Sequence, residues 1–486
     1  MIAHEALRGL RAGIVGAARE GTALARFLAA CHARVTLSDA KPAQALGERL
    51  AQLAGLDVRL ALGGAPLNLA DLDVLFLSPG VPPTAPIVGQ ARELGLPLSS
   101  EPRLFTQVCA APVVGITGSS GKTTTTALVG RMFACQGLET WVGGNIGEAL
   151  TERLLEPTGP DVAVLELSSF QLEMFSPDYQ GSAVEERRTA ASRVLSLDGW
   201  SPRVAAVTNI TPNHLDRHPS MEDYARAKAN LVRFQTPADW AVLNRDDPRS
   251  YALRAETRGR VLLFSLREPV DEGGYRAGDR LLLRLDGRET DLCRVRQVPL
   301  RGAHNLANVL TAACCALAGG ASTEAMREAV RTFSGVAHRL EIVREVAGVT
   351  YVNDSIATSP ERAIAALRAY REPLVLLAGG RDKNLPWEEW ADLALQRARI
   401  VIAFGEAVPI IEAALASARD RLLTGRDGLA TVERAVTMAE GVALAARLAR
   451  PGDVVLLSPG GTSFDAFDDF EQRGQAFRDQ VRGLGE

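Results

Sequence analysis

Residues 115–126 read GITGSSGKTTTT and directly follow the apolar run PVV at 112–114. A glycine-rich turn between a strand and a helix can point several backbone N–H groups at a phosphate. In such loops a lysine, here Lys122, meets the terminal phosphates, and a hydroxyl, here Thr123, meets a magnesium ion. The stretch therefore predicts a strand, a phosphate-binding loop and a helix, as in an α/β nucleotide-binding domain.

The spacing of the glycines departs from the usual phosphate loop. Ile116 stands where the first glycine is expected, and Gly118 lies three residues before Gly121 instead. The shorter string TGxxGKT can still form an anion-binding nest from its backbone N–H groups. An ordinary Gly/Ser/Thr loop explains the lysine and the threonines poorly, so the stretch by itself predicts a nucleotide ligand and no particular reaction.

The length and charge of the chain bound its class. A chain of 486 residues is too long for one typical core and suggests about three domains. The formal net charge is −4 and 23% of the residues are charged, so nothing indicates a nucleic-acid or anionic-membrane surface. We expect a monomer that binds small molecules and no nucleic acid.

The cysteines and apolar runs indicate the compartment. The six cysteines form no CxxC pair, and the first residues, MIAHEALRGLRAG, lack the apolar core of a signal peptide. No apolar run approaches the roughly 18 residues needed to span a bilayer. We therefore expect a cytoplasmic protein with reduced thiols and no integral membrane contact.

The first part of the chain has the pattern of a βαβ unit. Residues 12–39 show a short apolar strand, a glycine turn, an amphipathic helix and a second strand that ends at Asp39. The glycines do not make GxGxxG, so a Rossmann-like scaffold used in another way is at least as good an interpretation as a dinucleotide site. A buried strand with a Ser-Pro-Gly turn follows at 73–81, and this unit ends near residues 101–102.

The second unit contains two apolar strands, within 161–173 and 204–216, that end in polar residues. Ligands of an open α/β sheet gather at the carboxyl ends of its strands. We therefore expect the polar residues there to converge near the phosphate loop; they are Glu166, Ser168, Asn209 and His214. Between the strands, residues 179–202 are polar and aperiodic in their first half, which predicts a mobile surface insertion.

The third unit begins near residues 337–339 and has the pattern of another α/β sheet. It contains four apolar strands, in GVTYVNDS, PLVLLAGGRDK, RIVIAFG and DVVLLSPGGTSFD. Helical stretches such as 359–370 and 432–448 lie between them.

Three residues of the second unit suit a magnesium site. A magnesium ion on ATP phosphates needs hard oxygen ligands, which the Thr123 hydroxyl and the Glu166 carboxylate would supply, with His214 beside them. Singly, a helix N-cap acid and a loop histidine are equally good interpretations of Glu166 and His214, but together they favour the metal site. Lys228 lies on an amphipathic helix, and periodicity alone places it on the surface.

Polar residues beside apolar runs also suggest a site between the second and third units. They are Asn305, Arg339 and Asp354. For Arg339 the functional interpretation is bidentate binding of phosphate, and the alternative is an interdomain salt bridge.

With these strings assembled, the chain resembles the Mur ligase family of peptidoglycan synthesis nearly from end to end. The similarity is carried by TGSSGKTT, VGGNIG (142–147), ELSSFQLE (166–173), NITPNHLDRH (209–218), RGAHNLANV, HRLE, NDSIAT (353–358) and LSPGGTSFDAFDDFEQRG (457–474). Of these, ELSSFQLE and SFDAFDDFEQRG are typical of the members that add D-glutamate to UDP-N-acetylmuramoyl-L-alanine.

The resemblance implies an α/β fold of three domains. These are a Rossmann-like domain for the uridine substrate at 1–107, a central ATP-binding domain with a mostly parallel sheet at 108–336, and a Rossmann-like domain for the amino acid at 337–486. It also implies an ATP-dependent, ADP-forming amide ligase. The substrate carboxylate would attack the γ-phosphate to give an acyl phosphate, and the glutamate amine would then displace the phosphate. Both steps develop anionic charge, which suits a site rich in cations and magnesium.

Carried over by position, the resemblance implies four overlapping groups of site residues. The ATP-binding positions are Thr117, Gly118, Ser119, Ser120, Gly121, Lys122, Thr123, Thr124, Asn305, Asn308, Arg339 and Asp354, with His338 beside Arg339. The substrate-binding positions are Ser78, Gly80, Asn145, Ser168, Gln171, His214, Thr358, Lys383, Ser463 and Phe470. The metal positions, for two magnesium ions, are Thr123, Glu166, His214 and Lys228. The catalytic positions are Lys122, His214, Lys228 and Arg339.

Two features concern Lys228 and Ile356. Lys228 stands where the family has a lysine carbamylated by CO2, which overturns its interpretation as a surface residue. The family often has a lysine in NDSKAT where this chain has Ile356, so one cation is missing and L-glutamate or another amino acid stays an alternative acceptor. The insertion at 181–200 is also longer than the corresponding family segment.

Three other functions compete with this one. Another ligase of the same fold, such as a folylpolyglutamate synthetase, is disfavoured by SFDAFDDFEQRG. A nicotinamide-dependent oxidoreductase predicts GxGxxG after the first strand, and it leaves TGSSGKTT without a purpose. A non-catalytic nucleotide sensor predicts loss of the phosphate and metal ligands, all of which are present in the sequence.

Overall fold

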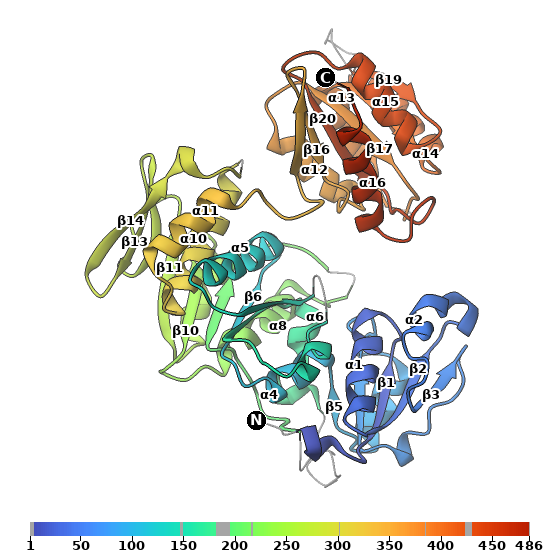
Figure 1. Ribbon diagram of the computed structural model, residues 1–486, viewed down its shortest axis with the longest axis vertical. Helices are drawn as coiled ribbons and strands as arrows, with labels where there is room; N and C mark the ends of the chain where they lie inside the picture. Colours follow the sequence, from blue (N-terminus) through green and yellow to red (C-terminus); the bar gives the residue numbers. More distant parts are fainter. Residues whose placement is uncertain are drawn as a thin grey trace. The chain divides into compact units, whose positions relative to one another are not determined.

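The computed structural model describes residues 4–145, 149–180, 195–214, 217–300, 302–383, 385–422 and 430–485 (Figure 1). In these ranges the chain forms three β-sheets. It divides into two compact units. From here on, the first unit is Met1–Pro299 with Ala303–Phe333, which holds the first and second units predicted from the sequence, and the second unit is Leu300–Gly302 with Ser334–Glu486. The mixed α/β class is confirmed. The three-domain boundaries at 107/108 and 336/337 stay a prediction.

The first sheet is parallel, with the strand order β3-β2-β1-β4-β5. Its strands are β1 (Arg11–Val15), β2 (Arg34–Asp39), β3 (Val58–Leu62), β4 (Val74–Leu77) and β5 (Leu98–Ser99). Its longer helices are α1 (Arg19–Ala30), α3 (Pro86–Glu93) and α4 (Glu101–Val108). The predicted βαβ unit is confirmed as β1, α1 and β2. The strand order reverses between β1 and β4, so the turns after them meet, and Ser78 Oγ donates to Gly16 O at 3.1 Å.

The second sheet has the order β14-β13-β12-β11-β10-β9-β6-β8-β7. Its parallel strands are β6 (Val113–Thr117), β7 (Thr140–Gly144), β8 (Val162–Glu166), β9 (Val204–Val207), β10 (Trp240–Asn244), β11 (Arg260–Ser265) and β12 (Gly273–Ala277). β13 (Arg280–Leu285) and β14 (Arg288–Arg294) extend it with antiparallel pairing. This antiparallel extension was not predicted from the sequence.

Helices connect and cover the second sheet. They are α5 (Lys122–Cys135), α6 (Ser169–Glu173), α8 (Met221–Arg233), α9 (Pro248–Ala252), α10 (Ala303–Ala318) and α11 (Thr323–Thr332). Helices α5, α10 and α11 pack together, and α6 packs against α8 (Figure 1). Helices α5 and α10 are therefore neighbours in space although they lie far apart in the sequence.

The third sheet forms the second unit, with the order β15-β16-β20-β17-β18-β19. Its strands are β15 (Glu341–Val346), β16 (Val349–Asn353), β17 (Leu374–Gly379), β18 (Ala398–Phe404), β19 (Thr431–Arg434) and β20 (Val454–Gly460). Its helices are α12 (Pro360–Ala369), α13 (Glu388–Arg397), α14 (Val408–Leu422), α15 (Met438–Leu448) and α16 (Phe470–Arg482). The helix predicted at 432–448 is wrong in its first part, because 431–434 pair with β18 as an edge strand. Pairing with a neighbouring strand outweighs local helix preference here.

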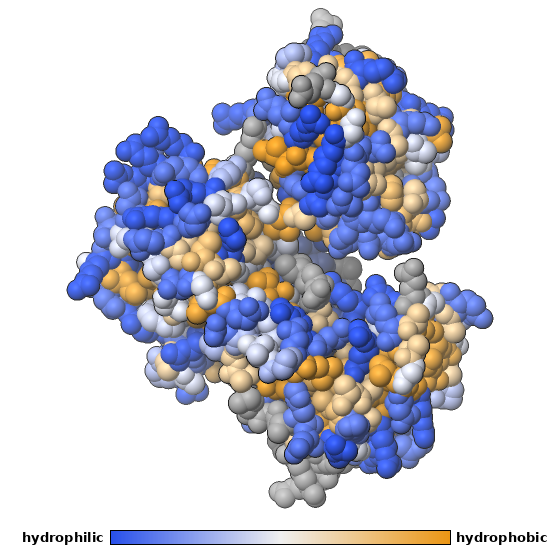
Figure 2. All heavy atoms as spheres, in the orientation of Figure 1, coloured by the Kyte–Doolittle hydropathy of each residue, from blue (hydrophilic) through white to orange (hydrophobic). Residues whose placement is uncertain are grey.

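Most of the predicted insertion lies outside the described residues, since 181–194 are not described. Its described flanks are packed: Gln180 is buried and hydrogen-bonds the backbone of Leu98, and Leu195 is buried. The face shown in Figure 2 is mostly hydrophilic with scattered apolar side chains. In the part of the chain that is described, no helix is both long enough and apolar enough to cross a membrane.

Candidate active site

The phosphate loop joins β6 to the N-terminus of α5, as the sequence predicts. Gly118 has φ +150° and Gly121 has φ +82°, a region in which side chains are strained. A Cβ atom at Gly118 would lie 1.9 Å from Thr208 Oγ1, and one at Gly121 would lie 2.3 Å from Asn308 Oδ1. Both glycines are therefore required by the backbone conformation and by close packing, and the loop presents a helix N-terminus suited to an anion.

The segment after β9 holds the loop in place. The Ser120 N–H donates to Asn209 Oδ1 at 3.0 Å, and Ser119 Oγ donates to Thr211 O at 2.9 Å. The predicted convergence of Asn209 on the phosphate loop is thus observed. Thr123 and Thr124 lie in the first turn of α5 and are buried.

Two lysine side chains donate hydrogen bonds to the phosphate loop. Lys122 Nζ donates to Gly118 O at 3.0 Å, and Lys228 Nζ donates to the same carbonyl oxygen at 3.1 Å and to Thr117 Oγ1 at 3.3 Å. Lys228 is only 1% exposed, so the surface position inferred from periodicity is wrong. Burial, with the charge of Lys122, lowers the pKa of Lys228 well below its ordinary value. Helix α8 directs this lysine toward the phosphate loop, where its Nζ also lies 4.7 Å from the Tyr224 ring centroid.

Glu166 ends β8, is 2% exposed, and lies near enough to Lys228 for their charges to interact. Its Oε1 accepts a hydrogen bond from Asn145 Nδ2 at 3.1 Å, while Oε2 is buried and has no hydrogen-bond partner among the described residues. A buried carboxylate oxygen without a partner is costly unless a cation or water meets it. The residue therefore fits its predicted role as a metal ligand. Within the described ranges, no three His, Cys, Asp or Glu side chains form a metal site by themselves.

His214 lies on the segment that follows β9, at φ +55°. Its ring packs edge-on against Phe170, with centroids 5.1 Å apart. A positive φ is uncommon outside glycine but less so for histidine, and such residues occur often at functional sites.

Ser168 and Gln171 form the N-terminal capping box of α6. Ser168 Oγ accepts from the Gln171 N–H, and Gln171 Oε1 accepts from the Ser168 N–H at 2.9 Å. The Gln171 amide nitrogen then donates to Glu20 Oε1 at 2.8 Å, and Gln171 is fully buried. Its amide already has partners on both sides, so its predicted contact with substrate stays a prediction. Ser78 and Gly80 lie in the turn after β4, where Gly80 is exposed.

Asn305 and Asn308 lie one turn apart on α10. Asn308 Nδ2 donates to Asn305 Oδ1 at 3.0 Å, and Asn308 Oδ1 lies against Gly121 and 3.5 Å from Thr125 Oγ1. The structure thus brings these two predicted ATP-binding residues to the phosphate loop.

The second unit holds the remaining predicted residues. Asp354 follows β16 and accepts hydrogen bonds from Ser458 Oγ at 2.9 Å and from the Leu340 N–H at 3.2 Å. Burial raises the pKa of Asp354 to about 7, and the charge of Arg339 opposes that rise. His338, at φ +63°, shares a 3.0 Å hydrogen bond with Asn353 Nδ2.

A cationic cluster lies at the start of α12 and α16. Lys383 Nζ donates to Thr358 Oγ1 at 3.4 Å, and burial, with the charges of Arg362 and Arg473, lowers the pKa of Lys383. Arg473 is fully buried and donates to Ser355 O at 2.8 Å and to Gly461 O at 3.1 Å. Ser463 is buried and Phe470 begins α16 in the same unit.

Sequence reasoning missed Glu20, Arg217 and Arg473. Arg473 belongs to the closing motif EQRG, which was a usable signal. Glu20 and Arg217 are ordinary charged residues in their local sequence. Their roles depend on partners 151 and 136–138 positions away, which no local pattern can reveal.

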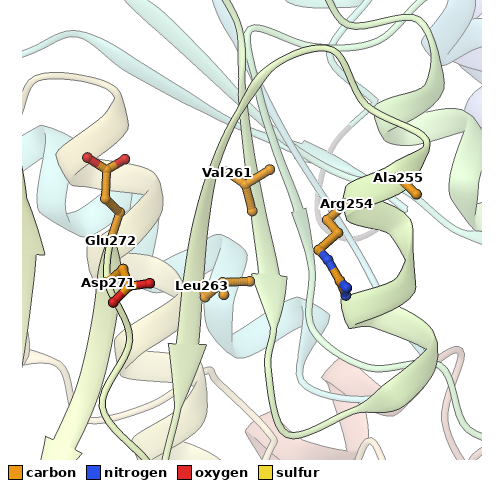
Figure 3. A pocket seen from close by; sticks show the side chains of 6 residues that line it. All are labelled: Arg254, Ala255, Val261, Leu263, Asp271 and Glu272. Carbon is orange, nitrogen blue, oxygen red and sulfur yellow. The ribbon is translucent and has the colours of Figure 1, made fainter.

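An open pocket of about 500 Å³ lies elsewhere in the first unit, along β11 (Figure 3). It is lined by Arg254, Ala255, Val261, Leu263, Asp271 and Glu272. None of the predicted site residues lines it. Its mixed charged and apolar lining indicates no particular ligand.

The fold and the site define an α/β protein with a nucleotide-phosphate loop, two lysines upon it and a buried acid beside it. Comparison with known proteins agrees with this class. The model of the Mur ligase middle domain matches residues 116–316, and that of the Mur ligase, glutamate ligase domain matches residues 338–461.

Full-length relatives are equally informative. A UDP-N-acetylmuramoylalanine--D-glutamate ligase of Symbiobacterium thermophilum is 44% identical over 480 residues, covering 98% of both chains. One from Pelotomaculum thermopropionicum is 42% identical over 475 residues, covering 97% of both. The crystal structure of a UDP-N-acetylmuramate-alanine ligase from Thermotoga maritima, 18% identical, covers 97% of this chain and 99% of its own with a TM-score of 0.55, which shows a shared fold. The chain belongs to the Mur ligase family.

Proposed function

We propose that this protein is an ATP-dependent, ADP-forming ligase that joins D-glutamate to UDP-N-acetylmuramoyl-L-alanine. One structural observation carries the proposal: Lys122 and Lys228 both donate to Gly118 O in a phosphate loop whose glycines leave room only for backbone, and the charge of Glu166 acts on Lys228. The end-to-end similarity to D-glutamate ligases supports the choice of substrates, including at Ile356, where L-glutamate was the alternative.

The residues of the first unit bind ATP and stabilise charge during phosphoryl transfer. The substrate carboxylate attacks the γ-phosphorus, the bond to ADP breaks, and an acyl phosphate forms. The N-terminus of α5 and Lys122 neutralise negative charge that accumulates on the phosphate oxygens. Lys122 now donates to Gly118 O, so it is already positioned over the loop.

Magnesium accompanies ATP, and Thr123 and Glu166 would hold it. When bound, the ion neutralises phosphate charge and orients the γ-phosphate. Glu166 Oε2, which is buried and has no hydrogen-bond partner among the described residues, supports this assignment. A second ion, held by His214 and a modified Lys228, is part of the proposal.

Carbamylation of Lys228 would convert its amine into a carboxylate. The neutral amine attacks the carbon of CO2 and loses one proton, which leaves a carbamate anion. The lysine is buried next to a second ammonium, an environment that disfavours a charged amine and favours its neutral form. The resulting anion would pair with Lys122 and add oxygen ligands to those of Thr123 and Glu166, in a part of the chain where no three described His, Cys, Asp or Glu side chains form a metal site by themselves.

The second unit would bind the amino acid. Lys383 provides positive charge suited to the carboxylates of glutamate, and the charge of Arg473 acts on Lys383. Thr358, Ser463 and Phe470 are proposed to complete that pocket, with Arg339 on the γ-phosphate and Asp354 on the ribose. The glutamate amine then attacks the acyl carbon, a tetrahedral intermediate forms, and phosphate leaves as the amide is completed. We propose that the enzyme acts as a cytoplasmic monomer.

Phosphate release is the direct test. ATP, magnesium and UDP-N-acetylmuramoyl-L-alanine are supplied with D-glutamate, with L-glutamate or without an amino acid. Release that depends on D-glutamate, with the amide product detected by mass spectrometry, is the expected result. Release with L-glutamate alone would make the acceptor assignment wrong, and none with either would reject this ligase. Lys122→Ala should abolish release while its circular dichroism spectrum stays that of the wild type.

A further inference from the structure

Arg217 joins two turns of the first unit that lie far apart in the sequence. Its Nη1 donates to Pro79 O at 3.3 Å and its Nη2 donates to Val81 O at 3.1 Å. Both carbonyls belong to the turn after β4, which contains two of the predicted substrate-binding residues. Arg217 itself lies three residues after His214, on the segment that follows β9. One guanidinium therefore spans a turn of the first sheet and a segment of the second.

An aromatic ring also packs against the flat face of the Arg217 guanidinium. The central carbon of the guanidinium lies 4.5 Å from the Phe170 ring centroid, and the same ring packs against His214, with centroids 5.1 Å apart. Nη2 lies 3.6 Å from Glu173 Oε2, and the Arg217 side chain is 11% exposed. Donation in the plane combined with stacking on the face is a geometry that arginine can provide and lysine cannot.

His218 fastens the same segment to both ends of α6. Its Nδ1 lies 3.2 Å from Glu173 Oε1, and its Nε2 lies 2.9 Å from Ser169 Oγ. Burial, then the charges of Arg217, Lys228 and His214, lower the pKa of His218 to about 4, while Asp223 opposes that shift. A neutral ring that faces a carboxylate donates from Nδ1 and accepts the Ser169 hydroxyl at Nε2. Helix α6 and residues 217–218 thus form one connected polar layer.

We propose that Arg217 is a positioning residue for the sugar-nucleotide substrate. It holds the 78–81 turn and the His214 ring in one geometry, so a ligand that touches both meets a site already ordered. This inference rests on the proposed function for the identity of that ligand. ATP contacts the phosphate loop, which Asn209 and Thr211 hold directly, so loss of Arg217 should weaken ATP binding much less than it weakens binding of the sugar nucleotide.

Arg92 on α3 offers a matched control. Its Nε donates to Tyr179 O at 3.1 Å, its Nη1 lies 3.4 Å from Pro83 O, and its guanidinium stacks on the Tyr179 ring at 4.8 Å. It thus has the same chemistry as Arg217: backbone carbonyls at the tip and an aromatic ring under the face. Its hydrogen bonds among the described residues reach neither the 78–81 turn nor the His214 segment.

Steady-state kinetics of the full-length variants Arg217→Met, Arg217→Lys and Arg92→Met test the proposal. Arg217→Met should raise the KM for UDP-N-acetylmuramoyl-L-alanine about tenfold, equivalent to ~1.4 kcal/mol, and leave the KM for ATP within about twofold of the wild type. Arg217→Lys should recover part of this loss, because an ammonium can still reach one carbonyl. Arg92→Met should lower the melting temperature without changing either KM. A sugar-nucleotide KM that is unchanged in Arg217→Met, or an ATP KM that rises equally, would overturn the proposal.

Hydrogen exchange of the unliganded protein separates this inference from the proposed function. Arg217→Met should accelerate amide exchange in residues 76–82 and 209–214 together, and Arg92→Met should leave 209–214 unchanged. Unchanged exchange in both segments of Arg217→Met overturns the positioning role whatever the activity. If the exchange result is as expected but the wild type releases no phosphate with these substrates, the proposed function fails and the link between the two turns stands.

Discussion

Replacing Glu20 by glutamine should make the stability of the first unit less dependent on pH. Glu20 begins the buried face of α1, is 7% exposed and accepts a hydrogen bond from Gln171 Nε2 at 2.8 Å. Burial, with the nearby charge of Glu101, raises the pKa of Glu20 from 4.5 to about 8. Burial also raises the pKa of Glu101, so two acids share one poorly solvated region.

The sign of the effect follows from proton linkage. The pKa of Glu20 is higher in the folded chain than in the unfolded chain, so folding is favoured where the group is protonated. This contribution is complete below pH 4.5 and is lost as the pH rises to about 8. At about 1.4 kcal/mol for each pH unit, the full interval corresponds to an upper limit of about 5 kcal/mol. Glutamine is neutral at every pH, and its carbonyl oxygen can accept the same hydrogen bond from Gln171.

Urea unfolding of the wild type and of Glu20→Gln at pH 5 and at pH 8.5 measures the difference. At each pH, the free energy of unfolding of the wild type is subtracted from that of Glu20→Gln. We expect this difference to be at least ~2 kcal/mol larger at pH 8.5 than at pH 5. The exposed Glu93 on α3 provides the control, since Glu93→Gln should give no such change. If the difference between Glu20→Gln and the wild type is the same at both values of pH, the reasoning is refuted.

Three further predictions concern the site. Gly121→Ala should lower kcat/KM for phosphate release at least tenfold. The φ angle of residue 121 is +82°, and the new Cβ would lie 2.3 Å from Asn308 Oδ1. The left-handed backbone conformation by itself destabilises an alanine by about 1–2 kcal/mol. Wild-type kinetics in that variant would contradict the loop geometry. Wild-type activity should fall in CO2-depleted buffer and return with bicarbonate, whereas Lys228→Ala should stay inactive in both; a CO2-independent rate would argue against the carbamate. Lys383→Met should raise the KM for D-glutamate about tenfold, because one charge-assisted contact is lost, and should leave the KM for ATP unchanged. If a D-glutamate titration of this variant gives the wild-type KM, Lys383 is not part of the pocket.

Much of the fold was predictable because its signals are local. The phosphate loop, the βαβ opening and the strands around 165, 205 and 455 follow from short apolar runs bounded by glycine, proline and polar residues. Polar residues at the ends of parallel strands also had to meet at one edge of the sheet, and Asn209 does meet the loop. In contrast, β19 was predicted as helix, because its strand state depends on pairing with β18.

The surroundings of the individual side chains were less predictable. A lysine on an amphipathic helix has the same local pattern whether it reaches water or turns under a neighbouring loop, so periodicity gave the wrong position for Lys228. The partners of Glu20 and Arg217 lie on other elements, and no spacing rule connects them. Among the predicted positions, Gln171 was identified by family resemblance, but its bond to Glu20 was not foreseen.

By itself, the sequence determined an α/β chain with a phosphate loop, a set of acids and amides at strand ends, and the motifs of one ligase family. Only the tertiary structure decided which of these groups are buried, which pairs share a hydrogen bond and which charges are shifted. The physical reason is that secondary structure and loop type depend on neighbours along the chain, whereas desolvation and hydrogen bonding depend on neighbours in space. Lys228, Glu166 and Glu20 acquire their chemistry from the second kind of neighbour.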